Sequence, residues 1–478
     1  MMQTTRPKAK SGFYIGVSCP ACGGELELEE NFFVLTCSHC GSALRIVRPN
    51  IPPAYLIRSK IPRTEVRFHL DHYLKENKLP LSDSGLEINA LYYPYWKIDA
   101  IVLKLRNRVE ERQVVEEDSY NSYGGCQSET IVKQRKTDIA LAPFMTTLAA
   151  GEPRDDIPYS IGMRAEYIKM EPFSREHLEE NFECFPVLKS WSQVETALSK
   201  DIAILGNINQ ADFGRNKTEL FNPIGALIYF PYFLIDISRG GNLHRIIIDG
   251  ITGRVLNDGV HYEMPEESKL PETTPIELGK LGVELHRCNN CGLDLPTEQA
   301  YVYICHNCHQ LVQLERHALL KSEISAVAPV SAAKDERYFP FWRLRLPEGS
   351  ARKLQILFGG IYQSDFLVVP AFKSANFEAM YRLAKRISAA SAKINSIPIE
   401  EFEDNYAAVT VGPSEALAMA EVIIYREKLS KSNSAIFQRN EFCPSEISLF
   451  FAPFHPENYF YVDSAMNAVT FEKTMVRN

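Results

Sequence analysis

The sequence lacks any apolar run long enough to cross a membrane as a helix. Its longest such run, residues 224–235, contains Gly225 and Pro231 and falls well short of the about 20 residues that a spanning helix needs. We therefore expect it to form a core strand. Residues 1–10 are polar and basic, with no apolar stretch behind them, so we expect no secretory signal. These absences predict a cytoplasmic protein without a transmembrane segment.

The sequence also lacks the motifs of common enzyme classes. It has no Walker phosphate loop, no dinucleotide-binding fingerprint and no nucleophile elbow. His69, Asp71 and His72 share one predicted helix, but no second cluster completes a metal site around them. Cys126 has no neighbour that would activate its thiol. We therefore expect no catalytic residues and no enzymatic activity.

No charge of one sign dominates the chain. A net charge of −8 over 478 residues, with 45% apolar and 23% charged residues, is ordinary for a globular protein. It gives no electrostatic reason to expect a nucleic acid or an anionic membrane as the main partner. The length exceeds what one core supports and predicts about three domains.

Cysteine is abundant, and eight of the eleven form two CxxC…CxxC sets with 14 and 13 residues between the inner cysteines. This spacing is typical of a tetrahedral zinc site with four thiolate ligands. Because thiolates would fill all four positions, we expect two structural zinc ions, and a reducing compartment. The predicted ligands are Cys19, Cys22, Cys37 and Cys40 in the first set and Cys288, Cys291, Cys305 and Cys308 in the second.

The loops around the cysteines support this interpretation. A small residue is expected after the second cysteine of each pair, and three of the four positions hold glycine: Gly23, Gly41 and Gly292. The fourth position holds His309, which departs from the pattern. Two further histidines, at positions 39 and 306, lie inside their loops, and we expect them to be exposed rather than ligating.

The charge around the predicted ribbons bears on the partner. Residues 19–44 contain four glutamates and residues 288–312 contain two acidic residues, and neither stretch contains lysine or arginine. Affinity for nucleic acid comes largely from neutralising phosphates. The leading hypothesis is therefore a non-catalytic, zinc-stabilised scaffold or adaptor that binds another protein. The alternative is a nucleic-acid-associated factor of transcription or replication type that uses the flanking Arg45, Arg48, Arg287 and Arg316.

Residues 19 to about 100 resemble a set of bacterial zinc-ribbon proteins of unassigned function. The resemblance is carried by residues 19–23 (Cys-Pro-Ala-Cys-Gly), 37–41 (Cys-Ser-His-Cys-Gly) and 93–96 (Tyr-Pro-Tyr-Trp). In those proteins a rubredoxin-like ribbon precedes one amphipathic helix and an aromatic–proline–tryptophan strand. Some carry the label of a transcription-factor-IIB-type or a primosomal-helicase-like ribbon, but this chain has no ATPase motif. The resemblance implies metal binding.

An aromatic–proline segment recurs four times. Period-two alternation after the proline predicts a strand with one buried face. Because proline cannot donate to a ladder, we expect it at a strand start, an edge or a bulge. The segments are residues 93–96, 230–233, 339–342 and, more weakly, 452–455.

Other stretches match in the same order, which predicts an internal duplication. We match residues 142–144 with 369–371, 170–173 with 396–399, 192–198 with 414–417, and 248–253 with 462–467.

The expected fold class is α+β, with two tandem halves that each hold a small four-cysteine ribbon and a mostly antiparallel sheet domain with few helices. The expected ribbons span 13–48 and 283–318. The expected sheet domains span 52–263, with a hairpin insertion at about 106–138, and 335–478. The hairpin would turn at residues 123–125, and its shorter counterpart would run through Gly359 and Gly360.

Four helices are expected. They are residues 63–77, a helix capped by Ser192 with Glu195 and ending near Lys200, a helix from Ser374 to about Ala390, and a helix from Ser414 to about Lys431.

Overall fold

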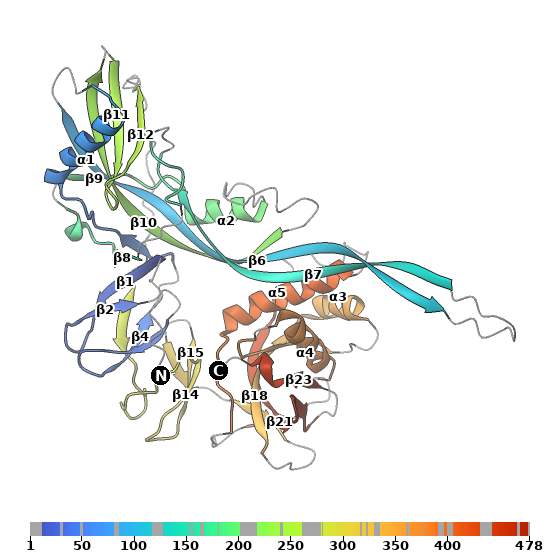
Figure 1. Cartoon of the computed structure of the whole chain (residues 1–478). Helices are drawn as coiled ribbons and strands as arrows, with labels where there is room; N and C mark the ends of the chain where they lie inside the picture. Colours follow the sequence, from blue (N-terminus) through green and yellow to red (C-terminus); the bar gives the residue numbers. More distant parts are fainter. Residues whose placement is uncertain are drawn as a thin grey trace, which may run out of the picture.

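The computed structural model of the chain is a mixed α+β structure in which strands outnumber helices (Figure 1), so the expected α+β class is confirmed. Within the residues that it describes, no helix has the length and apolar character needed to span a membrane. The structure describes residues 12–28, 32–47, 51–80, 86–116, 128–152, 154, 156–162, 167–179, 181–200, 218–239, 242–260, 279, 281–315, 318–321, 324–328, 335–359, 362, 364–374, 376–390, 396–398, 405–430, 442–465 and 469–476.

The described part of the chain divides into a first half, before residue 261, and a second half, after residue 278. The elements of the first half are β1 (Gly12–Ser18), β2 (Glu25–Leu28), β3 (Val34–Thr36), β4 (Ala43–Val47), β5 (Ala54–Leu56), α1 (Arg63–Glu76), β6 (Glu87–Glu116), β7 (Ser128–Ala149), β8 (Tyr167–Pro172), β9 (Phe182–Cys184), α2 (Trp191–Lys200), β10 (Thr218–Arg239), β11 (Asn242–Asp249) and β12 (Val255–Val260). Those of the second half are β13 (Gly282–Leu285), β14 (Val302–Ile304), β15 (Leu311–Glu315), β16 (Ala318–Lys321), β17 (Ser325–Val327), β18 (Arg337–Arg345), α3 (Glu348–Phe358), β19 (Phe366–Pro370), α4 (Phe377–Ala390), β20 (Ser396–Pro398), α5 (Pro413–Ser430), β21 (Glu446–Glu457), β22 (Phe460–Asp463) and β23 (Thr470–Glu472).

Two long strands form the centre of the first sheet. β6 and β10 pair antiparallel, with Trp96 opposite Leu227. The outer edge of β10 is taken by β5 and then by β11, and the outer edge of β6 by β9 and then by β7. From β5 the sheet continues through β8 to β1 and β2. The expected apolar run 224–235 is thus a central core strand.

The second sheet has its centre at β18 and β21. They also pair antiparallel, with Trp342 opposite Leu449. The outer edge of β21 is taken by β17 and then by β22, and that of β18 by Tyr406 and then by β19. Because β17 belongs to this sheet, the sheet begins before residue 335, where the sequence placed the start of the second sheet domain.

Each proline of the four aromatic–proline segments lies where its strand changes partner along the outer edge. At such a gap, a backbone N–H pointing to the outer edge would face no acceptor on a neighbouring strand. Proline suits this position because it has no backbone N–H. The prolines therefore lie within their strands, at a local edge, rather than at a strand start or a bulge. Their carbonyl oxygens accept backbone N–H groups from Ala150 (2.9 Å, to Pro94), Gly250 (3.0 Å, to Pro231), Ala371 (2.9 Å, to Pro340) and Ser464 (3.0 Å, to Pro453).

The central strands are buried on both faces, and the expectation of one buried face is wrong. Every residue from 90 to 98 is buried. Tyr93 and Tyr95 pack into one core of the first half, and Trp96 packs on the opposite side of the sheet. Lys97 suggested a solvent-facing position, but its side chain is 1% exposed and its ammonium donates to Asp99. A long lysine stem can be buried in this way because the charged end reaches a partner.

Helix α1 lies where the sequence predicted it, with Val66, Leu70 and Leu74 buried. Helix α2 also forms, but its expected cap is wrong by two residues. The Ser190 hydroxyl accepts the Gln193 N–H (3.3 Å) and the Gln193 side chain accepts the Ser190 N–H (2.9 Å). This reciprocal pair is a capping box in which glutamine replaces the expected glutamate.

Helices α4 and α5 of the second half are capped differently from the expectation as well. Asn376, not Ser374, accepts the Ala379 N–H with its side chain (3.2 Å) at the start of α4. Helix α5 begins with Pro413, whose fixed φ suits the first helical position. The Glu415 side chain there accepts the Gly412 N–H (3.0 Å).

The two halves differ most beyond the central strand pair. In the first half β6 and β7 continue as a two-stranded arm, which extends to the right in Figure 1 past α5 and α3. The expected hairpin 106–138 falls within this arm, and its expected turn at 123–125 lies outside the described residues. In the second half α3, which the sequence analysis did not anticipate, connects β18 to β19. Gly359 ends this helix with φ 89°, so the expected hairpin counterpart there is wrong.

Helices α4 and α5 of the second half pack against the base of this arm. Phe221 of β10 and Val422 of α5 are buried against each other, with Leu141 and Tyr425 partly buried beside them. The rings of Phe221 and Tyr425 meet edge to face at 6.1 Å. This apolar contact joins the two sheets away from the cysteine clusters.

Candidate metal centres

Each cysteine pair lies in a tight turn closed by two backbone hydrogen bonds. In the first turn the Cys19 N–H donates to Gly24 O (2.8 Å) and the Gly23 N–H donates to Cys19 O (2.9 Å). The same two bonds recur in the turns that begin at Cys37, Cys288 and Cys305, with lengths of 2.8–3.1 Å. The four turns are therefore copies of one backbone conformation, as the CxxC spacing predicted.

The residue after the second cysteine has a positive φ in all four turns. The angles are 75° at Gly23, 76° at Gly41, 76° at Gly292 and 54° at His309. Glycine adopts this left-handed conformation without the steric cost that a Cβ brings. The expected need for a small residue thus has a backbone cause, and His309 meets it at a cost.

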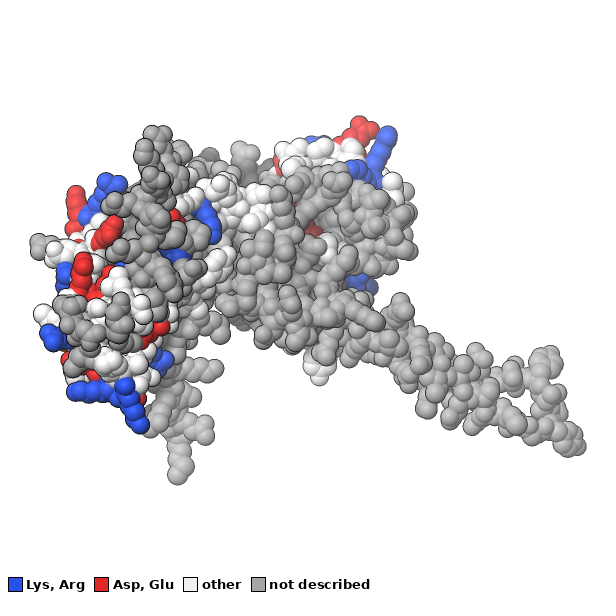
Figure 2. Space-filling model, turned by 90° about the horizontal axis from the view of Figure 1, so that it is seen from above, with Lys and Arg blue, Asp and Glu red and all other residues white. Residues whose placement is uncertain are grey.

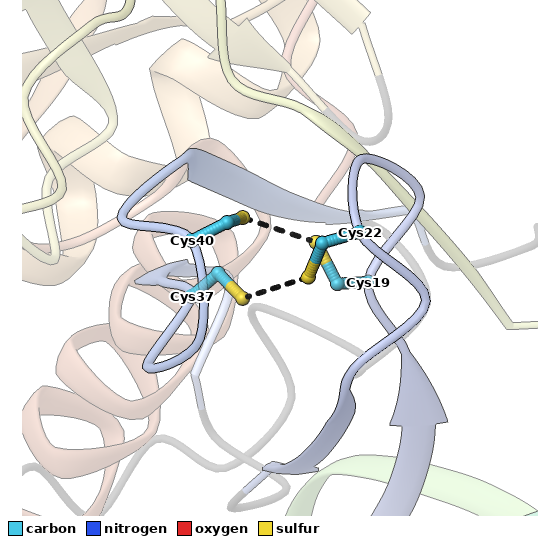
Figure 3. Close-up of side chains that lie close together, drawn as sticks. All are labelled: Cys19, Cys22, Cys37 and Cys40. Carbon is cyan, nitrogen blue, oxygen red and sulfur yellow. Dashed lines mark hydrogen bonds between the residues drawn. The ribbon is translucent and has the colours of Figure 1, made fainter.

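The structure brings the predicted ligands together in two clusters. In each set of four, all the Sγ atoms lie within 4.8 Å of one another. The Sγ–Sγ distances are 3.8 Å for Cys19–Cys40 and 3.9 Å for Cys22–Cys37, the two pairs joined by dashed lines in Figure 3. In the second cluster they are 3.6 Å for Cys288–Cys308 and 3.4 Å for Cys291–Cys305.

These distances fit a metal ion better than a disulfide. Four thiolates at the Zn–S length of about 2.3 Å in a tetrahedron are separated by about 3.8 Å, whereas a disulfide joins sulfurs at about 2.05 Å. All eight thiols are free. The donor set and its spacing therefore suit a tetrahedral metal ion in each cluster.

The fourth cysteine of each set has a thiol pKa well below its ordinary value. Hydrogen bonds from the Ser42 hydroxyl and its backbone N–H lower the pKa of Cys40 to about 6. The Asn290 side chain and the Gln310 N–H lower the pKa of Cys308 to about 6. Burial raises the pKa of Cys305 to about 11. Because only thiolates bind metal, the lowered pKa of Cys40 and of Cys308 favours the metal-binding form of each of these two ligands.

The neighbouring histidines take no part in either cluster. His39 is exposed, packs over Gly24, and its Nε2 lies 2.9 Å from the Glu25 carbonyl oxygen. His306 is exposed as well. In the described part of the chain the two cysteine sets are the groups of side chains that could hold a metal ion.

The other candidates from the sequence show no such assembly among the described residues. His72 faces Glu76 of the same helix at 3.4 Å, and the ring of His69 lies against Gly253. Burial raises the pKa of Cys184 to about 11, which disfavours its thiolate. Cys126 lies outside the described residues.

Each ribbon is anchored to other parts of the structure by strand pairing. β1, which precedes Cys19, pairs in parallel with β8 of the first sheet. β13, which precedes Cys288, pairs instead with β4, which follows Cys40. The second ribbon therefore adds a strand to the first, an arrangement that the sequence analysis missed because spacing reports only local geometry.

A buried histidine marks this contact and was also missed. His286 is fully buried, and its ring meets the ring of Tyr303 edge to face at 4.5 Å. Its backbone N–H donates to Ala43 O of the first ribbon (2.8 Å). Burial, together with the charge of Arg45, lowers the pKa of His286 to about 4, so the ring is neutral at neutral pH.

Comparisons with known proteins add no family assignment. No protein-family model, no curated protein and no solved structure matches the chain. The resemblance of residues 19 to about 100 to bacterial zinc-ribbon proteins therefore stays a prediction.

Proposed function

We propose that this protein is a non-catalytic scaffold or adaptor that binds two structural zinc ions and engages another protein. The observation that carries the proposal is the pair of closed four-cysteine clusters. Thiolates supply all four ligands of each cluster, so a tetrahedral zinc ion would keep no open position for a substrate or an attacking water. Small ribbons of this type depend on metal for folding, and the ions would supply that stability.

We further infer that the two halves arose by duplication of one ribbon–sheet unit. The Trp96 Nε1–H donates to Lys189 O (2.7 Å), and the Trp342 Nε1–H donates to Val411 O (2.8 Å). Each carbonyl lies just before the helix that follows, α2 or α5. The central strands keep the same register relative to their prolines in both sheets. Long-range contacts repeated at equivalent positions support a common origin more strongly than sequence similarity alone.

The closing turns repeat in the same way. Asp249 accepts the Ile251 N–H (2.8 Å), and Asp463 accepts the Ala465 N–H (2.8 Å), with both aspartates 1% exposed. One earlier match needs correction, because Trp96 lies opposite Leu148 and Trp342 opposite Val369. The segment equivalent to 369–371 is therefore 148–150, not 142–144.

The charges near the ribbons favour a protein partner over nucleic acid. Arg45 pairs with Glu284 (2.5 Å) and Arg287 with Asp294 (2.9 Å), so acidic groups already neutralise these two flanking cations. Figure 2 is seen from above Figure 1, from the side of α1, β11 and β12 and away from the ribbons, and on that face too described basic and acidic residues lie intermixed. Phosphate binding draws on uncompensated lysine and arginine. The pairing of Arg45 and Arg287 therefore argues against phosphate binding beside the ribbons.

Two measurements on the full chain test the proposal. Metal analysis of protein purified under reducing conditions should give about two zinc ions per chain. Affinity purification with chemical cross-linking should then recover a defined partner whose cross-links fall on this chain. A matched variant, Cys37→Ser with Cys305→Ser, should lose the zinc.

The opposing outcomes are distinct. Protein that folds without metal would overturn the zinc assignment. Salt-sensitive binding to DNA or RNA, with no protein cross-links, would favour the nucleic-acid-associated alternative. If protein with its full zinc content recovers neither a protein partner nor a nucleic acid, the scaffold assignment is wrong.

A further inference from the structure

The two ribbons share one small sheet. β13 pairs antiparallel with β4, with Leu285 opposite Leu44 and Gly282 opposite Val47. On its other side β4 pairs with β3, which lies between the two cysteine pairs of the first ribbon. The strand that leads into Cys288 is thus held by a segment that the first cysteine cluster positions.

A residue of the first ribbon belongs to the core of the second. Val34 of β3 is fully buried and packs in a cluster with Cys288, Cys305 and Tyr303 of the second ribbon. Its neighbour Phe33 stacks on Tyr301 with ring centroids 4.7 Å apart, although Phe33 is only partly buried. The second ribbon therefore lacks a complete core unless β3 of the first is in place.

Polar contacts fix the register of this contact. The Gln299 side chain accepts the Phe33 N–H (3.2 Å) and donates to Val34 O (2.5 Å), so one amide satisfies two backbone groups of the first ribbon. The hydroxyls of Thr36 and Thr297 lie 2.8 Å apart. We call this set of contacts, with the Arg45–Glu284 ion pair, the ribbon junction.

We propose that the two four-cysteine clusters bind metal cooperatively, with the ribbon junction carrying the coupling. This inference rests on the proposed zinc binding. A metal ion in the first cluster holds Cys22 and Cys37 together, and so orders the β3 and β4 that complete the second ribbon. The benefit is reciprocal, because a coupling free energy acts equally on both sites. Metal binding in such ribbons is inseparable from their folding, which makes ordering of one ribbon a gain for the other.

The test measures zinc affinity at one cluster after the other is removed. In the full chain with Cys37→Ser and Cys40→Ser, competition with a chromophoric chelator should show zinc binding at the second cluster weakened at least about fivefold, the lower range of coupling between sites. Cys305→Ser with Cys308→Ser should weaken zinc binding at the first cluster by the same factor.

In a Val34→Ala, Gln299→Ala background, removing one cluster should change the zinc affinity of the other less. Leu320→Ala, at a side chain 47% exposed on β16, is the matched control and should leave the coupling intact.

A second measurement needs no cysteine variant. Native mass spectrometry of the wild-type chain at half-saturating zinc should show less one-zinc protein than independent sites would give. The coupling would be overturned by two results together. Removing either cluster would change the zinc affinity of the other by less than twofold, and the wild-type chain would show the distribution of zinc expected for independent sites. Absence of zinc from the wild-type chain would instead overturn the proposed function, so the two failures are distinguishable.

Discussion

At the scale of single residues, the four cysteine turns differ in one position. The left-handed residue is glycine in three turns and His309 in the fourth. A side chain in this conformation costs about 1–2 kcal/mol. A Cβ added at Gly41 would meet no atom within 4 Å, so the cost there comes from the backbone angle alone.

We therefore expect opposite effects from two substitutions. Gly41→Ala should lower the free energy of unfolding of the zinc-bound chain by about 1–2 kcal/mol, and His309→Gly should raise it by up to about 1 kcal/mol. Urea denaturation followed by circular dichroism would measure both. Gly349→Ala in α3, where an added Cβ also meets nothing within 4 Å, is the control and should not destabilise. Equal effects at Gly41 and Gly349 would contradict the backbone explanation.

A second prediction concerns pH. Arg154 donates two hydrogen bonds to Asp156, at 2.9 and 2.7 Å. Burial alone would raise the pKa of Asp156, but these bonds and the charges of Arg154 and Arg245 outweigh it and lower the pKa. The unfolded carboxyl has a pKa of about 3.9. The stabilisation is thus fully present above that pH and is lost as the pH falls through the lower folded value.

Asp156→Asn should accordingly destabilise the chain by about 1–3 kcal/mol at pH 7. The difference from wild type should shrink as the pH falls below about 4. Urea midpoints of both proteins across this range would measure it. Glu446→Gln, whose ion pair with Arg345 is more than half exposed, should change stability by less than about 1 kcal/mol. A difference at Asp156 that does not vary with pH would contradict the assigned cause.

Local residue patterns gave part of this structure correctly. The cysteine spacing predicted both clusters because a CxxC turn is set by a few adjacent dihedral angles. The helix caps were harder to predict, since Ser190 and Ser192 both suit an N-cap. In the structure Ser190 is the cap, and the carbonyl of the preceding Lys189 accepts the Trp96 Nε1–H, a long-range contact that local sequence does not show.

At the scale of elements, the equivalent tryptophans of the two sheets offer a direct comparison. Trp96 and Trp342 are each 1% exposed and each donate to the carbonyl that precedes a helix. Trp96→Phe and Trp342→Phe should therefore cost similar free energies, about 1–3 kcal/mol each, from the unpaired carbonyl and the lost volume. Tyr459→Phe, 82% exposed, should be neutral. Calorimetry of the three variants would show whether the two positions respond alike, and a neutral result at either would contradict their equivalence.

The arm is the element that the fold should need least. Beyond Lys104, where β10 stops pairing with β6, the described strands of the arm pair only with each other. A two-stranded hairpin is marginal by itself in water. Replacing residues 106–138 by Asn-Gly, which joins the paired residues Leu105 and Ile139 through a two-residue turn, should therefore change stability by less than about 1 kcal/mol.

Thermal unfolding and zinc content would measure the effect of this deletion. Val102→Ala, at a side chain 3% exposed in the paired part of β6, is the positive control and should destabilise by about 1–3 kcal/mol. A deletion that unfolds the chain or releases zinc would show that the arm supports the core.

Elements whose sequence resembled a turn were the hardest to predict. Residues 348–358 lead up to Gly359, where the sequence analysis expected a short hairpin, and no helix was predicted there. They form α3 because Ala351, Leu354 and Leu357 bury one side of the helix. Tertiary burial decided the outcome over local propensity.

At the scale of the whole molecule, the contacts that join the halves could not be read from spacing or periodicity. The pairing of β13 with β4 connects residues more than 200 positions apart in sequence, and α5 meets β10 through Phe221 and Tyr425. Neither contact leaves a periodic trace in the chain. Both became visible only once the strands were placed in space.

These two contacts predict that the halves stay together without a covalent connection. A specific protease site inserted within residues 264–275 should allow cleavage into two fragments that still elute as one species of full mass when zinc is bound. The junction residues Val34 and Gln299 and the apolar contact at Phe221 would hold the two fragments together.

Removing zinc with a chelator should weaken the complex of the two fragments, because the ribbons then lose the order that the junction requires. Size-exclusion chromatography with mass detection, over a dilution series, would measure this. In a cleaved Val34→Ala, Gln299→Ala variant the fragments should separate at lower dilution than in cleaved wild type, and fragments that separate freely with zinc bound would contradict this account of how the halves are joined.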